Sequence, residues 1–208
     1  MTVTLTNKKW TLSARPETSV SKEHFNLETE TVRELVDGEF LVKNQYLAFE
    51  PAQRGWLNDV RSYLPPVAIG EVMRSGAAGE VIASKHSDYQ VGDLVQGSFG
   101  WQEYAISDGT GLFPVTKIPA GIPISYPLHI FGLTGLTAYF GLLDLGLPKA
   151  GETVLISGAA GATGSTVGQI AKLLGCRVIG IAGGEAKCQW LIDELGYDAV
   201  IDYKSDFV

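Results

Sequence analysis

The chain has 208 residues, 45% hydrophobic and 19% charged, which allows one large domain or two small ones and argues against disorder. Its net charge of -7 argues against nonspecific binding of nucleic acid, which requires an excess of basic residues, so no nucleic-acid partner is expected. The N-terminus lacks a signal-peptide core, no apolar run is long enough to span a membrane, and two cysteines form no metal-type spacing. We expect a cytoplasmic protein.

The first part of the chain has the pattern of a β-rich domain. Short runs of β-branched and aromatic residues, separated by glycine, extend from Glu39 to Val115. The clearest runs are residues 39–47, 79–83, 93–96 and 101–106. Four prolines between residues 114 and 127 then mark a loop-rich crossing. This pattern predicts a compact all-β barrel or sandwich, which we assign to residues 1–125.

From residue 126 to residue 208 the chain alternates helix and strand. Apolar periodicity and terminal glycines predict helices at 133–145, 163–174 and 185–195, and strands at 154–157, 177–182 and 199–201. Such alternation predicts a parallel sheet with right-handed crossovers. The fold class is therefore α/β plus β.

A glycine turn between the first of these strands and the next helix carries the main chemical signal. Gly158, Gly161 and Gly164 stand three residues apart, which allows a tight turn and close approach of the backbone to a pyrophosphate. The helix that starts there offers free N–H groups and a partial positive charge. Such a turn can also be purely structural, but its place in a βαβ unit favours cofactor binding, with Ala162 and Thr163 included in the site.

The end of the second strand indicates which dinucleotide would bind. NAD sites usually place an acid here to hold the ribose 2′-OH, whereas this strand ends in Ala182, Gly183 and Gly184. The glycines leave room for a 2′-phosphate, and Lys187 can supply charge-assisted hydrogen bonds to it. Glu185, an acid at the start of the next helix, argues against a 2′-phosphate site unless its side chain points outward. Lys187, taken alone, could be an ordinary exposed lysine. The pattern favours NADP(H).

Several segments together resemble the zinc-independent medium-chain dehydrogenase/reductases, in the branch of prostaglandin reductases, leukotriene B4 dehydrogenases and alkenal double-bond reductases. The segments are residues 50–56, 62–67, 70–74, 91–97, 132–141, 151–165 and 167–172. The resemblance implies a GroES-like β-barrel followed by a Rossmann domain, of which these residues would form a partial sheet with the strand order 3-2-1. It also implies hydride transfer from NADPH to the C=C bond of an α,β-unsaturated aldehyde or ketone, which would be the small-molecule substrate.

The resemblance also implies roles for individual residues. Lys187 and Tyr203 would meet the adenosine 2′-phosphate, Leu133 and Thr137 would lie near the nicotinamide, and Tyr63 would lie near the substrate. The family's usual Met-Pro pair is replaced here by Leu133 and Thr134. The Gly-His-Glu element and four-cysteine lobe of the zinc branch are missing from the sequence, so no metal is expected.

No catalytic residue is identified by the sequence. The acid–base candidates are Tyr63, Tyr139, Glu50 and Asp59, and each has a plain structural role available. Two alternatives to a reductase stay open. One is a truncated relative that catalyses a redox-independent reaction in an interdomain pocket, and the other is a non-catalytic binding module.

The sequence stops after the third predicted strand, whereas members of the resembled family continue through further strands. The first strand would then lie at an exposed sheet edge with an apolar run, which is an aggregation hazard unless another chain covers it. We therefore expect a homodimer or a complementing chain at this edge. The missing part would also weaken or remove binding of the nicotinamide half of NADP(H).

Overall fold

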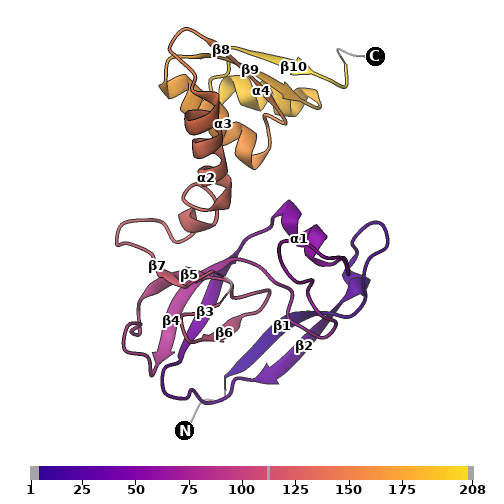
Figure 1. Ribbon diagram of the computed structural model, residues 1–208. Coiled ribbons are helices and arrows are strands. Elements are labelled where there is room, and N and C mark those ends of the chain that lie inside the picture. Colours follow the sequence, from indigo (N-terminus) through magenta and orange to yellow (C-terminus); the bar gives the residue numbers. More distant parts are fainter. Residues whose placement is uncertain (1–4, 112, 206–208) are drawn as a thin grey trace. The chain divides into compact units, whose positions relative to one another are not determined.

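The computed structural model describes residues 5–111 and 113–205 (Figure 1). Contacts divide the chain into two compact units, Met1–Leu128 and His129–Val208, which we call the β unit and the α/β unit. The division falls close to the boundary expected after residue 125. Within the described residues, none of the helices is both long enough and apolar enough to cross a membrane.

The β unit contains two antiparallel sheets. The small sheet pairs β1 (Thr6–Leu12) with β2 (Phe25–Thr31). The large sheet has the strand order β6-β3-β4-β5-β7. Its strands are β3 (Phe40–Leu47), β4 (Ala77–Ser84), β5 (Leu94–Gly97), β6 (Tyr104–Ser107) and β7 (Thr116–Lys117). The β-rich first domain that the sequence predicts is confirmed.

Two apolar clusters hold the β unit together. One lies on the large sheet, where Phe40, Val81 and Val95 are fully buried. The other gathers Leu12 from β1 and Trp56 from helix α1 (Pro51–Trp56). The sequence pattern did not reveal β1, β2 or α1. In β2 only the first residue is buried, so the strand lacks the alternation by which a half-covered strand is recognised.

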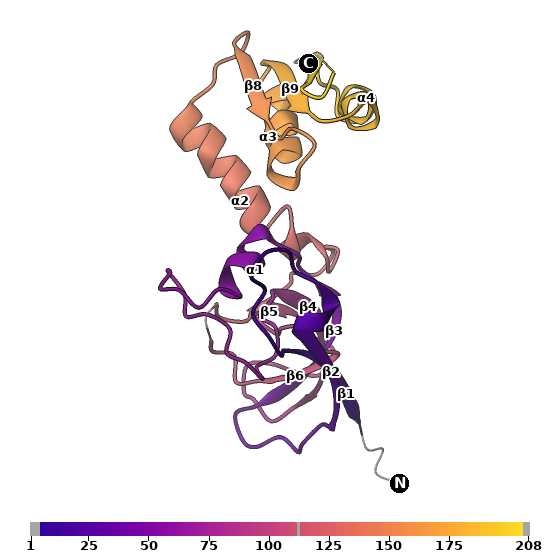
Figure 2. The same ribbon diagram turned by 90° about the vertical axis from the view of Figure 1, so that its right-hand side faces the viewer.

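The α/β unit is built on a parallel sheet with the strand order β10-β9-β8, which confirms the predicted 3-2-1 arrangement. The strands are β8 (Thr153–Ser157), β9 (Arg177–Ala182) and β10 (Ala199–Asp202). The helices are α2 (Leu133–Phe140), α3 (Ala162–Leu173) and α4 (Glu185–Asp193). Helix α2 packs against α3 (Figure 2).

Both crossover helices of the α/β unit cover the same face of its sheet (Figure 1). Ile156 and Val178 point to this face and pack with Ala171 of α3 and Leu191 of α4. Alternation along the strands directs Leu155 to the opposite face, where 59% of its surface is exposed. One face of the sheet is thus a packed core, while the other presents apolar side chains.

The predicted helix over residues 133–145 is α-helical only to Phe140. It continues as a π-helical turn, Gly141–Gly146, in which the backbone winds more widely. The N–H of Leu147 donates to the carbonyl of Leu142, and Leu147 then adopts a left-handed conformation with φ of 46°. Pro148 follows and has no N–H with which to continue the helix.

Candidate functional site

The glycine turn after β8 is held tightly by its own backbone. The N–H of Gly161 donates to the carbonyl of Gly158 at 2.8 Å, and the N–H of Ala159 donates to Ile181 of the neighbouring strand at 3.0 Å. Gly158 has a φ of 58°, in the left-handed region that glycine adopts readily. A Cβ on Gly164 would lie 2.5 Å from the Gly158 carbonyl oxygen, so only glycine lets α3 approach the turn this closely.

The first turn of α3 leaves three backbone donors free. The N–H groups of Ala162, Thr163 and Gly164 have no acceptor among the described residues, and Gly161 at the N-cap has no side chain to bind them. The helix dipole adds a partial positive charge at the same end. This arrangement fits a phosphate group, because aligned N–H donors and positive charge act together.

The carboxyl end of β9 lies beside this turn. Because the strands are parallel, Ser157 pairs with Ile181 and Asp202 pairs with Ala182, so all three strands end at the same edge. The phenol ring of Tyr203 packs over Gly183, where a Cβ would lie only 2.7 Å from the ring.

Lys187 extends the site on the helix side of this edge. It stands in the first turn of α4 and is exposed. The structure therefore brings the glycine turn, Lys187 and Tyr203 to one edge of the sheet. Glu185, the acid that argues against a 2′-phosphate site, is also exposed.

Asp202 is a residue of this edge that the sequence analysis missed. Its Oδ1 accepts hydrogen bonds from the N–H groups of Gly184 at 2.9 Å and Lys204 at 3.0 Å. These backbone bonds, that from Gly184 first, lower the pKa of the Asp202 carboxyl. The carboxyl ends of the strands do include a carboxylate. It comes from β10, however, and it is hydrogen-bonded to the turn after β9. An acid at the carboxyl end of a parallel strand was the signal in the sequence that could have revealed it.

The sequence analysis also missed Tyr197, which contacts the first turn of α3. Its hydroxyl donates to the carbonyl of Gly164 at 2.9 Å. Its ring occupies space that the missing side chains of Gly168 and Gly180 leave open. Burial raises the pKa of Tyr197 to about 12. The tyrosine thus fixes the position of α3 relative to β9.

Comparison with known proteins identifies the family. Residues 8–115 match a family model described as the N-terminal domain of oxidoreductase. The NADPH-dependent curcumin reductase of Escherichia coli is 44% identical over 200 residues, which are 96% of this chain and 57% of that protein. Prostaglandin reductase 1 of Mus musculus is 40% identical over 202 residues, 95% of this chain and 58% of the relative. The crystal structure of CurA from Vibrio vulnificus in complex with NADPH superimposes with a TM-score of 0.87 at 45% identity, covering 95% of this chain and 58% of that one.

The chain belongs to the zinc-independent medium-chain dehydrogenase/reductases, in their double-bond reductase branch. It spans 57% to 59% of the length of the two bacterial relatives that match it at 44% identity. In this family member, as in the sequence-based expectation, a β-rich domain precedes the strands of a Rossmann sheet.

Helix α2 carries the two residues expected near the nicotinamide. The hydroxyl of Thr137 donates to the carbonyl of Leu133 at 2.7 Å, within the helix itself. The side chain of Leu133 is 61% exposed. The nicotinamide roles of Leu133 and Thr137 stay predictions.

The four acid–base candidates each have a local environment of their own. Glu50 caps α1, Asp59 lies 3.9 Å from the Nε of Arg15, and the Tyr63 hydroxyl accepts a hydrogen bond from Trp56 Nε1 at 3.0 Å. Tyr139 lies on α2 with its ring edge-on to Phe140. Among the described residues, none of the four is hydrogen-bonded to another, and a catalytic role for any of them stays a prediction. Within residues 5–111 and 113–205, no three His, Cys, Asp or Glu side chains gather as metal ligands would.

Proposed function

We propose that this chain provides the cofactor-phosphate site of an NADPH-dependent reductase that acts on the C=C bond of an α,β-unsaturated aldehyde or ketone. The observation that carries the proposal is the meeting, at one sheet edge, of the free donors of α3 with Lys187 and Tyr203. The names of the relatives support it, since they include curcumin, prostaglandin and 2-alkenal reductases that are described as NADPH- or NADP-dependent in two cases.

Each part of the edge has a task in this proposal. The N–H groups of Ala162, Thr163 and Gly164 bind the pyrophosphate, and the Gly158 turn keeps side chains away from it. Lys187 and Tyr203 bind the 2′-phosphate, with the ammonium group neutralising its charge. NADPH, when bound, supplies a hydride for the β-carbon of the substrate.

The remaining assignments follow the resemblance of this chain to its family. Leu133 and Thr137 line the nicotinamide side, and Tyr63 contacts the substrate. One of the acid–base candidates would protonate the α-carbon, and Tyr63 is preferred because its hydroxyl accepts from Trp56 and keeps its own proton available to a ligand. Both cysteines are free, which supports the cytoplasmic location expected from the sequence.

NADPH fluorescence provides the test of the cofactor site. The chain is titrated with NADPH and with NADH, and we expect tighter binding of NADPH. Lys187→Gln removes a charge-assisted hydrogen bond and weakens NADPH binding by about tenfold while leaving NADH binding unchanged. Lys22→Gln, at an exposed lysine of the β unit, is the matched control. Equal affinity for the two dinucleotides, or an unaffected Lys187→Gln variant, contradicts the proposed 2′-phosphate site.

Turnover is tested separately, by NADPH oxidation in the presence of benzylideneacetone. Binding with turnover supports the reductase. Binding without turnover limits the proposal to the cofactor site. If NADPH does not bind at all, the redox-independent enzyme and the non-catalytic module become the better explanations.

We also propose that another chain covers the free edge of β8, as a second copy in a homodimer or as a complementing polypeptide. β8 pairs only with β9, so its other side presents unpaired backbone groups within the described sheet. Such an edge favours strand addition. The exposed Leu155 in the middle of β8 adds apolar surface to the same place.

A further inference from the structure

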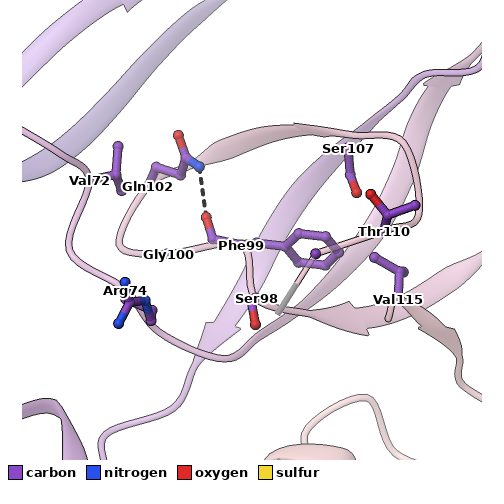
Figure 3. A pocket seen from close by; sticks show the side chains of 10 residues that line it. Val72, Arg74, Ser98, Phe99, Gly100, Gln102, Ser107, Thr110 and Val115 are labelled. Atoms are coloured by element: carbon purple, nitrogen blue, oxygen red, sulfur yellow. Dashed lines mark hydrogen bonds between the residues drawn. The ribbon is translucent and has the colours of Figure 1, made fainter. Parts of the chain in front are cut away.

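A cavity of about 310 Å³ lies within the β unit, among the loops after β5 and β6 and the segment that leads into β4 (Figure 3). Arg74 and Ser98 contribute polar groups to its lining, while Val72, Phe99 and Val115 contribute apolar ones. None of the residues assigned to the cofactor or to catalysis lines it. The cavity is therefore a separate feature of the molecule.

The guanidinium of Arg74 is held in place by two contacts. One N–H group donates to the carbonyl of Pro65 at 2.9 Å. The guanidinium carbon lies 5.5 Å from the ring centre of Trp56, which is a cation–π distance. Trp56 is itself buried and fixed through its hydrogen bond to Tyr63. Arg74 is thus oriented before any ligand arrives, which lowers the entropic cost of binding.

Most of the donors of Arg74 have no acceptor. An arginine has five N–H groups, and in the described part of the chain only the bond to Pro65 uses one. No carboxylate forms an ion pair with it there, and no acidic side chain lines this cavity. The hydroxyl of Ser98 is likewise without a hydrogen-bond partner among the described residues. The polar end of the cavity therefore offers donors and a positive charge, with nothing to neutralise them.

A neighbouring recess of about 360 Å³ shares Ser98, Phe99 and four other lining residues with the cavity and includes Glu39 and Asp108. The carboxylate of Glu39 is bound by Arg33, and that of Asp108 accepts hydrogen bonds from Thr110. These acids are occupied, but their negative charge disfavours a second anionic group at that end. The charge distribution favours a ligand with one anionic group, placed at Arg74.

We propose that this cavity binds a small monocarboxylate with an apolar tail. The planar carboxylate receives hydrogen bonds from the Arg74 guanidinium, whose fork geometry matches it, and from the Ser98 hydroxyl. The tail lies along Phe99, Val72 and Val115. This site lies in the β unit alone, and its occupancy does not depend on the proposed reduction.

The test compares phenylacetate with phenylacetamide, two probes of nearly the same shape that differ in charge. Each is titrated into the 15N-labelled chain, and the indole N–H signal of Trp56, which stacks on Arg74, is followed by NMR. We expect saturable shifts with phenylacetate and at least about tenfold weaker binding of the amide, because charge-assisted hydrogen bonds are lost.

Two variants locate the site. Arg74→Gln abolishes the preference for phenylacetate, and Arg61→Gln, at an exposed arginine, leaves it intact. If Arg74→Gln disturbs the fold through the loss of its contact with Trp56, Ser98→Ala tests the same site with that contact preserved and weakens phenylacetate binding several-fold. Equal binding of acid and amide, no saturation with phenylacetate, or parent-like binding by a folded Arg74→Gln variant would each overturn the proposal.

Discussion

At the scale of single residues, the fit between Tyr197 and two glycines determines how helix α3 and the glycine turn before it lie against β9. The tyrosine hydroxyl holds the Gly164 carbonyl, while its ring fills the space beside Gly168 and Gly180. A side chain added at Gly168 or Gly180 would overlap the ring, unless Tyr197 also changed. This contact explains why helix α3 carries a glycine in its interior, where glycine lowers helix stability.

Removing the hydroxyl in Tyr197→Phe should lower the free energy of unfolding by about 1 kcal/mol, because the Gly164 carbonyl loses its partner. The pKa of Tyr197 is raised from 10.0 to about 12 in the folded chain, so the folded state holds this proton more strongly than the unfolded state does. The corresponding stability is complete below pH 10 and is lost as the pH rises toward 12. Urea unfolding between these pH values should show this loss in the parent and in Tyr46→Phe, an exposed control, but not in Tyr197→Phe.

Gly168→Ala should destabilise the chain by about 1–3 kcal/mol, because the added methyl group would overlap the ring of Tyr197. Gly55→Ala is the matched control, since this helical glycine has open space around its Cβ position. There the same change should stabilise the fold by up to about 1 kcal/mol. Thermal unfolding of both variants distinguishes steric overlap from helix propensity; equal effects of the two changes would contradict the packing assignment.

At the scale of elements, side chains from neighbouring segments fix the ends of strands. Asp202 at the end of β10 binds the turn after β9, and Glu39 just before β3 binds Arg33 and the N–H of Val36. In both cases the carboxylate accepts a hydrogen bond from a backbone N–H group that lies outside the strands, at Gly184 and at Val36. The residues in such a contact are not spaced with the period of a helix or a strand. Periodicity in the sequence therefore does not reveal the contact.

The Arg33 hydrogen bonds, followed by that from Val36, lower the pKa of Glu39 from 4.5 to about 2. A lowered pKa contributes stability that is present above pH 4.5 and is lost as the pH falls toward 2. Glu39→Gln should therefore unfold at a lower temperature than the parent above pH 4.5, and the difference should shrink on acidification. Glu17→Gln, at an exposed carboxylate, serves as the control. A difference that is independent of pH would contradict the assignment.

The strands and helices of the α/β unit could be predicted from sequence because their apolar periodicity and terminal glycines are strong. Arg177–Ala182 is an example, where every second residue is buried and the predicted bounds match β9. β2 could not be predicted, because its faces are mostly exposed. At the site, the glycine turn is a local pattern, whereas Tyr197 and Asp202 act through contacts that only the folded chain creates.

At the scale of the whole chain, the most exposed apolar feature of the α/β unit's sheet is the edge strand β8. Leu155 should lie in the proposed contact with a covering chain, so Leu155→Lys should shift the assembly toward monomer because a buried lysine lacks a partner there. Sedimentation equilibrium over a range of concentrations measures the shift. Leu27→Lys, at a similarly exposed leucine of β2, is the control. A parent chain that stays monomeric throughout the range rules out the homodimer.

The packing of Tyr203 over Gly183 has a consequence for attempts to change the proposed cofactor preference by protein engineering. The usual route from NADP to NAD introduces an acid at the tip of the second strand. At position 183 any side chain would collide with the ring of Tyr203, and at position 184 the backbone has a φ of 97°, which an aspartate adopts only with strain. A redesign for NADH would therefore have to move or replace the ring of Tyr203 before it altered the glycines.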